Sequence, residues 1–224
     1  MIRVFGRDKS GIKRLTDKIK KSGLKRNIIF SYGGDGTYLL CERRFPGIPK
    51  ILVKNNRIGK QCGGISVDKA LKMLNKNKYS IKKNIKIELR IGDNKLTAVN
   101  DIVIRNRLQY EALRFNIYIN GKKIGSTFIG DGLITSTPFG SGGYFKSCTG
   151  KTFSTGLGIA LNNTVNNVRP LFIDGSSEIK VKILRGDAYC SADNSHKMIL
   201  LKKGGIAKIQ KSKNYARLVE LCII

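Results

Sequence analysis

The turn Gly33-Gly34-Asp35-Gly36-Thr37 holds the residues whose types and spacing are best suited to chemistry. It follows the apolar run Ile28–Phe30, which is typical of a strand end, and it precedes Tyr38–Phe45, which has the pattern of a helix. Glycines at a strand-to-helix turn let backbone N–H groups approach a ligand closely, and the N-terminus of a helix favours an anion. Because a carboxylate would repel a bound phosphate, we expect Asp35 to hold a cation or to accept a proton. This combination indicates phosphoryl transfer.

Two later segments carry side chains suited to a nucleotide. In Gly130–Tyr144 an acidic residue precedes a strand, and a loop rich in Gly, Ser and Thr ends in a tyrosine. Small residues allow close approach of the backbone, hydroxyls supply neutral hydrogen bonds and the ring offers a stacking face. In Asn100-Asp101 an amide beside a carboxylate could hold a ribose diol or an adenine edge. Taken alone, the loop within Gly130–Tyr144 is equally consistent with a flexible hairpin connection. The Asn100-Asp101 pair, taken alone, is equally consistent with a cap on a strand or turn.

The first 84 residues alternate between short strand and helix patterns. Residues 2–5, 28–30 and 51–53 are apolar enough for strands, while Ser10 and Ser66 stand where they could cap helices. The first of these helices is expected to close at Gly23. Alternation of this kind predicts an α/β domain over residues 1–84, with a small Rossmann-like parallel sheet that carries the glycine turn.

From residue 85 the pattern changes to strict alternation of apolar and polar residues. It is clearest in Ile85–Ile91 and in Leu113–Ile119, and the latter runs into Asn120-Gly121, a strong two-residue hairpin signal. Further strands are expected at residues 123–129, 132–136, 178–184 and 198–201. Residues 85–209 are thus predicted to form a second, all-β domain that resembles a β-sandwich. The two segments suited to a nucleotide lie within it, so we expect this domain to bind the nucleotide substrate. The apolar tail within 210–224 could pack back onto the first domain.

Composition restricts the class of protein further. The chain carries 43 basic and 15 acidic residues, which gives a formal net charge of +28. Such a field attracts nucleic acid, anionic lipid or polyanionic small molecules, although a solvated basic surface explains the same composition, so nucleic acid is a possible partner and not the favoured one. Five scattered cysteines without a CxxC pair predict neither a metal site nor a disulfide framework. With no apolar stretch near the roughly 20 residues that span a bilayer, and no signal-peptide pattern, we expect a cytoplasmic protein without membrane contact.

Three segments, taken in order, resemble the NAD kinase family: GGDGT at 33–37, the Asn-acid pair at 100–101, and GDGLITSTPFGSGGYFKS at 130–147. The resemblance implies transfer of a phosphoryl group from ATP, or from polyphosphate, to the 2′-hydroxyl of the adenosine ribose of NAD, giving NADP. It also implies Mg²⁺ that arrives with ATP, and a homo-oligomer. GGDGT is shared with lipid kinases, so a lipid or sugar kinase is the nearest alternative. A non-catalytic nucleotide-binding or nucleic-acid-binding relative is the other.

The resemblance also assigns roles to residues. Asp35 matches the general base, which takes the proton from the attacking hydroxyl. The phosphate-binding residues are those of the glycine turn: Gly33, Gly34, Gly36 and Thr37. The residues that match substrate contacts are Asp35, Gly36, Asn100, Asp101, Asp131, Gly142, Gly143, Tyr144 and Ser147. Asp193 matches a late aspartate of less defined role. The chain departs from the family pattern at Asp101, where Glu is usual, and at Phe139 and Gly142-Gly143, where TGSTAY has become FGSGGY.

Overall fold

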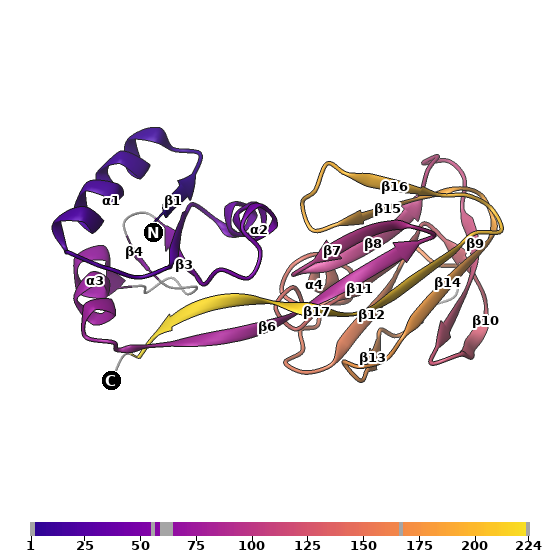
Figure 1. Ribbon diagram of the computed structural model, residues 1–224. Coiled ribbons are helices and arrows are strands. Elements are labelled where there is room, and N and C mark those ends of the chain that lie inside the picture. The colour runs from indigo at the N-terminus through magenta and orange to yellow at the C-terminus, as the bar shows by residue number, and fades with distance from the viewer. Residues whose placement is uncertain (1–2, 55–56, 59–64, 166–167, 223–224) are drawn as a thin grey trace. The chain divides into compact units, whose positions relative to one another are not determined.

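The computed structural model describes residues 3–54, 57–58, 65–165 and 168–222, and it divides into two compact units (Figure 1). The first unit comprises residues 1–84 and 215–224, and the second comprises residues 85–214. Two strands carry the chain from one unit into the other, β6 (Tyr79–Ile91) and β17 (Ile206–Leu221). Among the described residues, no helix combines the length and the apolar character that crossing a membrane requires. Ile2 and Cys62, which entered the sequence-based expectations, lie outside the described residues.

The first unit is built on a parallel sheet. Its strands β1 (Arg3–Gly6), β2 (Ile29–Tyr32) and β3 (Lys50–Lys54) lie in this order, and β17 joins β3 in parallel. Two short strands, β4 (Arg57–Ile58) and β5 (Ile65–Ser66), continue from β3 in antiparallel pairing. The predicted Rossmann-like α/β unit is therefore observed.

Two helices, α1 (Lys9–Lys21) and α3 (Val67–Asn75), cover one face of this sheet. Their apolar sides share a core with alternate strand residues; the core includes Leu15, Ile19, Phe30, Ile51, Val53, Ala70, Leu71, Leu74 and Val219. The third helix, α2 (Asp35–Arg44), lies on the other side of the sheet (Figure 1). A sheet buried on both faces explains why its strands read as continuous apolar runs rather than as alternating patterns.

The helix boundaries confirm one predicted cap and correct another. Ser66 caps α3, because its Oγ accepts a hydrogen bond from Lys69 N at 3.3 Å. Ser10 does not cap α1: the N-cap is Asp8, two residues earlier, and its carboxylate accepts from the backbone N–H groups of Ser10 and Gly11 at 3.0 and 3.1 Å. The charged carboxylate is the stronger acceptor for the unpaired N–H groups of a first turn, so it displaces the serine.

The second unit is a sandwich of two sheets. In one, antiparallel pairing joins β17, β14 (Ile179–Arg185), β9 (Leu113–Ile119) and β10 (Lys122–Gly130), with β6 and β7 (Asn94–Ala98) beside β17. The other has the order β13 (Leu171–Ile173), β12 (Leu157–Asn162), β11 (Gly132–Ser136), β8 (Asp101–Asn106), β15 (Ala188–Ala192) and β16 (Met198–Leu201). The sandwich-like all-β domain predicted from the sequence is thus present.

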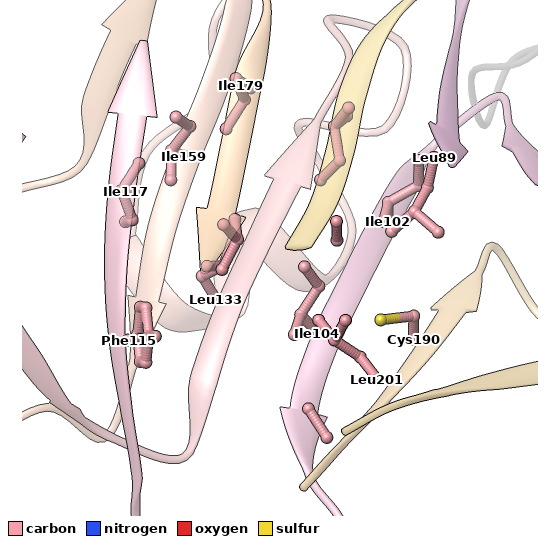
Figure 2. Packing of buried hydrophobic residues seen from close by; sticks show 14 of the residues in the cluster. Leu89, Ile102, Ile104, Phe115, Ile117, Leu133, Ile159, Ile179, Cys190 and Leu201 are labelled. Atoms are coloured by element: carbon pink, nitrogen blue, oxygen red, sulfur yellow. The ribbon is translucent and has the colours of Figure 1, made fainter. Parts of the chain in front are cut away.

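Apolar side chains from both sheets fill the space between them. Figure 2 shows Phe115, Ile117 and Ile179 from the first sheet together with Leu133 and Ile104 from the second. The hairpin predicted at Asn120-Gly121 joins β9 to β10, and both residues have positive φ, 49° and 83°, as a type I′ turn requires. A short helix, α4 (Tyr144–Thr149), packs against β11 and β12 through the buried ring of Phe145.

Candidate active site

The glycine turn of the first unit links β2 to α2. Gly33 N donates to Val53 O at 2.8 Å, which ties the turn to the neighbouring strand, and Gly34 serves as the N-cap in an extended conformation. The helix was expected from Tyr38 and actually begins at Asp35, because Gly34 O already accepts from the backbone N–H groups of Thr37 and Tyr38. Asp35 therefore lies in the first turn of α2, where the helix dipole favours negative charge.

The glycines leave the start of this helix open. Gly33 has φ +149°, and a Cβ built there would lie 2.4 Å from Thr37 Oγ1, so a side chain at this position is excluded. A Cβ at Gly34 would meet nothing within 4 Å, and no side chain caps the helix. Asp35 and Gly36 are exposed. A phosphate can thus approach backbone N–H groups here, with a carboxylate beside it that is accessible to a substrate hydroxyl.

A buried ion pair anchors α2 behind this turn. Lys50 Nζ, at the start of β3, donates to Glu42 Oε2 at 2.5 Å and to the carbonyls of Phe45 and Ile48 at 2.5 and 2.8 Å. Both charged side chains are fully buried. Glu42 Oε1 in turn accepts from Gly47 N at 3.3 Å. The pair therefore binds the C-terminal end of α2 to the connection into β3, and sequence reasoning gave it no role.

In the second unit, the Asp193 carboxylate organises the turn that contains Asn100 and Asp101. It accepts from the backbone N–H groups of Val99, Asn100 and Asp101, with the shortest distance 2.7 Å to Asn100 N. Asp193 N also donates to Asp101 O at 2.9 Å, and Asp193 itself has a positive φ of 50°. Asp193 is therefore the residue that shapes this turn, a role that the sequence alone did not disclose.

Asp101 is a buried carboxylate beside a second one. The residue is only 7% exposed. Desolvation by burial, followed by the negative charge of Asp193, raises the pKa of Asp101 from its ordinary value of 3.8 to about 7. Near neutral pH, Asp101 can thus donate a hydrogen bond as well as accept one.

The loop that follows β11 is hydrogen-bonded to the turn that contains Asn100 and Asp101. Thr137 N donates to Asn100 O at 2.8 Å and Thr137 Oγ1 donates to Val99 O at 2.5 Å. Gly140 lies so close to Asn100 that a Cβ there would come within 2.3 Å of Asn100 O. The Asn100 Oδ1 atom is buried, and the described residues offer it no hydrogen-bond donor. This oxygen is consequently suited to accept from a ligand, such as the amino group of a base.

Asp131 lies at the opposite end of β11. In the ladder between β11 and β8, Ser136 pairs with Asp101, whereas Gly132 pairs with Arg105. Asp131 precedes Ser136 by five residues, which corresponds to about 16 Å along the strand. Asp131 accepts from Asn163 Nδ2 at 2.9 Å and, more weakly, from Asn106 Nδ2 at 3.5 Å. Within one chain, the Asp131 and Asp101 carboxylates therefore lie too far apart to bind the same small group.

The remaining predicted substrate contacts surround α4. Tyr144 Oη accepts from Asn162 Nδ2 at 3.3 Å, so the tyrosine ring extends toward the Asp131 end of the sheet. Gly142 and Gly143 are exposed at the start of the helix. Ser147 is exposed as well, and its hydroxyl donates to Tyr144 O at 2.8 Å. The structure adds two polar residues to this end, Asn162 and Asn163, to which the sequence analysis assigned no role.

Comparison with known proteins identifies the family. Residues 99–221 match the model of the ATP-NAD kinase C-terminal domain. This chain belongs to the NAD kinase family. A protein of Clostridium perfringens named NAD kinase is 28% identical over 213 residues, which are 89% of this chain and 76% of that protein. An NAD kinase of Thermoplasma acidophilum is 26% identical over 211 residues, covering 88% of this chain and 74% of that protein.

Two solved structures share the fold of this NAD kinase family member. The NAD kinase from Archaeoglobus fulgidus in complex with ATP superposes with a TM-score of 0.80 at 18% identity, over 97% of this chain and 92% of that one. Yeast NADH kinase complexed with NADH gives a TM-score of 0.83 at 16% identity, over 97% and 82%. As a member of this family, the chain is a kinase. The family match lies mainly in the second unit. It does not include the GGDGT turn that lipid kinases share, so the assignment to the family does not depend on that turn.

Proposed function

We propose that this chain phosphorylates the 2′-hydroxyl of the adenosine ribose of NAD, with ATP or polyphosphate as donor, to give NADP. The observation that carries the proposal is the exposed Asp35 in the first turn of α2, next to a glycine turn with open space at Gly34. The glycine turn supplies N–H groups for the donor phosphates, and Asp35 supplies a base. The two structural neighbours, one in complex with ATP and the other with NADH, support ATP as donor and a nicotinamide dinucleotide as acceptor.

In this mechanism Asp35 accepts the proton of the 2′-hydroxyl while the oxygen attacks the terminal phosphorus of the donor. The O–P bond to the hydroxyl forms as the bond to the leaving phosphate breaks, and the N–H groups at the turn orient the phosphates. Asn100 and Asp101 bind the nucleotide, and the buried Asn100 Oδ1 accepts a hydrogen bond from an amino group of the ligand. General-base catalysis of this kind contributes about 10²–10⁴-fold to rate.

Mg²⁺ fits this arrangement as a companion of the donor phosphates. The described residues contain no group of three or more His, Cys, Asp or Glu side chains that could enclose a metal ion. Mg²⁺ is commonly held by substrate phosphates with one or two carboxylates, so such a group is not required, and Asp35 is the carboxylate at the phosphate end. When bound, the ion offsets negative charge on the transferred group. We further propose that the enzyme works as a homo-oligomer, which light scattering would test.

The test is NADP formation from NAD, ATP and Mg²⁺ by the wild type and by Asp35→Asn. We expect turnover to fall by at least the 10²-fold that a general base supplies, while NAD binding measured by calorimetry changes little. Asp93→Asn, which alters an exposed carboxylate in a turn of the second unit, is the matched control and should keep full activity. An Asp35→Asn variant that retains most of its turnover would remove Asp35 from the role of base. Replacement of ATP by polyphosphate in the same assay identifies the donor.

A further inference from the structure

The basic residues of the first unit are concentrated on the helical layer formed by α1 and α3. Residues 7–26 and 66–78, which contain these two helices and their flanks, hold thirteen basic and only three acidic residues. Two of the acids already have partners: Asp8 caps α1, and Asp68 pairs with Lys18. The layer therefore carries a large excess of positive charge that its own carboxylates do not balance.

The two helices bring cations together along the seam between them. Arg14, Lys18 and Lys21 have the spacing i, i+4, i+7, so they share one side of α1. Lys18 Nζ reaches Asp68 Oδ2 on α3 at 2.9 Å, which shows that this side faces α3. Lys72 follows Asp68 by four residues and thus lies on the side of α3 that faces α1. All four cations are exposed.

Contacts at the end of the seam hold the two helices in register. Asn75 Nδ2 donates to Ser22 O at 2.8 Å, and the Arg26 guanidinium donates to the side chain of Asn77. The apolar sides of both helices are in one core. The cations are consequently displayed on a packed scaffold rather than on a loose tail, and their spacing along α1 is about 6 Å for each step of four residues.

We propose that this seam binds the phosphate backbone of double-helical nucleic acid, independently of base sequence. Rows of exposed cations on a helical scaffold attract a phosphate backbone and release its counterions. The two segments contain no Phe, Tyr or Trp at all. Binding of single strands relies on aromatic rings that stack on unpaired bases, so a layer without such rings suits a duplex whose bases are already stacked. This binding is separate from phosphoryl transfer and requires no residue of the proposed active site.

The experiment measures fluorescence anisotropy of a labelled 20-base-pair duplex of mixed sequence, titrated with the full chain up to 100 µM. If the four seam cations each contact a phosphate, log K should fall with log[salt] with a slope of about −3.6, or about 150-fold between 50 and 200 mM salt. A variant with Arg14→Gln, Lys18→Gln, Lys21→Gln and Lys72→Gln should lose most of the affinity at 100 mM salt and show a much shallower slope.

The matched control changes four exposed lysines of the second unit, Lys122→Gln, Lys123→Gln, Lys202→Gln and Lys203→Gln, and so lowers the net charge by the same amount. It should bind the duplex nearly as the wild type does. Equal losses in the two variants would show that total charge, and not the seam, attracts the duplex, and would overturn the proposal. So would tighter binding of the single strand than of the duplex, or seam-dependent binding to phosphatidylserine vesicles without binding to the duplex. Circular dichroism confirms that both variants fold.

Discussion

The buried carboxylate of Asp101 predicts an unusual dependence of stability on pH. In the native state Asp101 keeps its proton until about pH 7, because burial and the neighbouring charge of Asp193 disfavour its ionised form. In the unfolded chain it loses the proton near pH 3.8. Between these values the native state binds more protons than the unfolded state, so the contribution of Asp101 to stability is largest at low pH and falls as pH rises to about 7.

The magnitude follows from the distance between the two pKa values. At about 1.4 kcal/mol for each pH unit, ionisation of Asp101 lowers the free energy of unfolding by about 4 kcal/mol in total, of which about 2 kcal/mol falls between pH 5 and pH 7. Asp101→Asn removes the titration while it preserves the size of the side chain. The variant should therefore gain about 2 kcal/mol relative to the wild type between pH 5 and pH 7, and almost nothing further above about pH 8.

The assay is urea unfolding of both proteins at several pH values, followed by far-ultraviolet circular dichroism because the chain has no tryptophan. Taking the difference between variant and wild type cancels the titration of all other groups. Asp93→Asn, in an exposed turn, is the control for the loss of one carboxylate elsewhere in the chain. A difference between Asp101→Asn and the wild type that stays flat across pH would refute the reasoning, since it would mean that Asp101 ionises equally easily in both states.

Variants of the Lys50–Glu42 pair and of Asp193 test the residues that support the site. Lys50→Met should destabilise the protein by about 3–5 kcal/mol in urea unfolding, because it leaves the Glu42 carboxylate buried without its partner, and adding Glu42→Gln should restore much of the loss. Asp193→Ala should lower stability by about 2–4 kcal/mol and weaken NAD binding, because the N–H groups of the turn at Asn100 lose their acceptor. Asp193→Asn, which keeps one oxygen and tolerates positive φ, should be milder in both measurements; equal effects would contradict this.

Sequence reasoning succeeded where local pattern and tertiary environment agree. Leu113–Ile119 and Met198–Leu201 form strands with the predicted bounds, since every second side chain of the first faces an apolar core. Strands β12 and β15 were not predicted, because sequences such as LGIALN and AYCSA contain small residues of weak strand propensity that become strands between two partners. The short helix α4 was missed for a similar reason, since it is held by the burial of Phe145 rather than by propensity.

In the candidate site, the sequence identified the residues proposed to contact a ligand. It did not identify the residues that hold those ligand-contacting residues in place. The glycine turn and the Asn100-Asp101 pair were recognisable as motifs because their residues are adjacent. Asp193 acts on a turn 92–94 residues away, and the pairing of β8 with β15 brings the two together only in the folded sheet. The Lys50–Glu42 pair was hidden in the same way, because nothing in a single sequence distinguishes a buried lysine from the many exposed ones.

The path of β17 has a consequence for the order in which the protein matures on the ribosome. Residues 206–209 pair with β14 in the second unit, while Leu218 pairs with Lys50 of β3, and Val219 lies in the core of the first unit. The first unit begins the chain, yet its sheet lacks a strand until the whole second unit has been synthesised. Domains usually mature from the N-terminus onward. Here the sandwich can finish first, and the nascent α/β sheet must wait with the Lys50 end of β3 unpaired on one side until its last strand emerges.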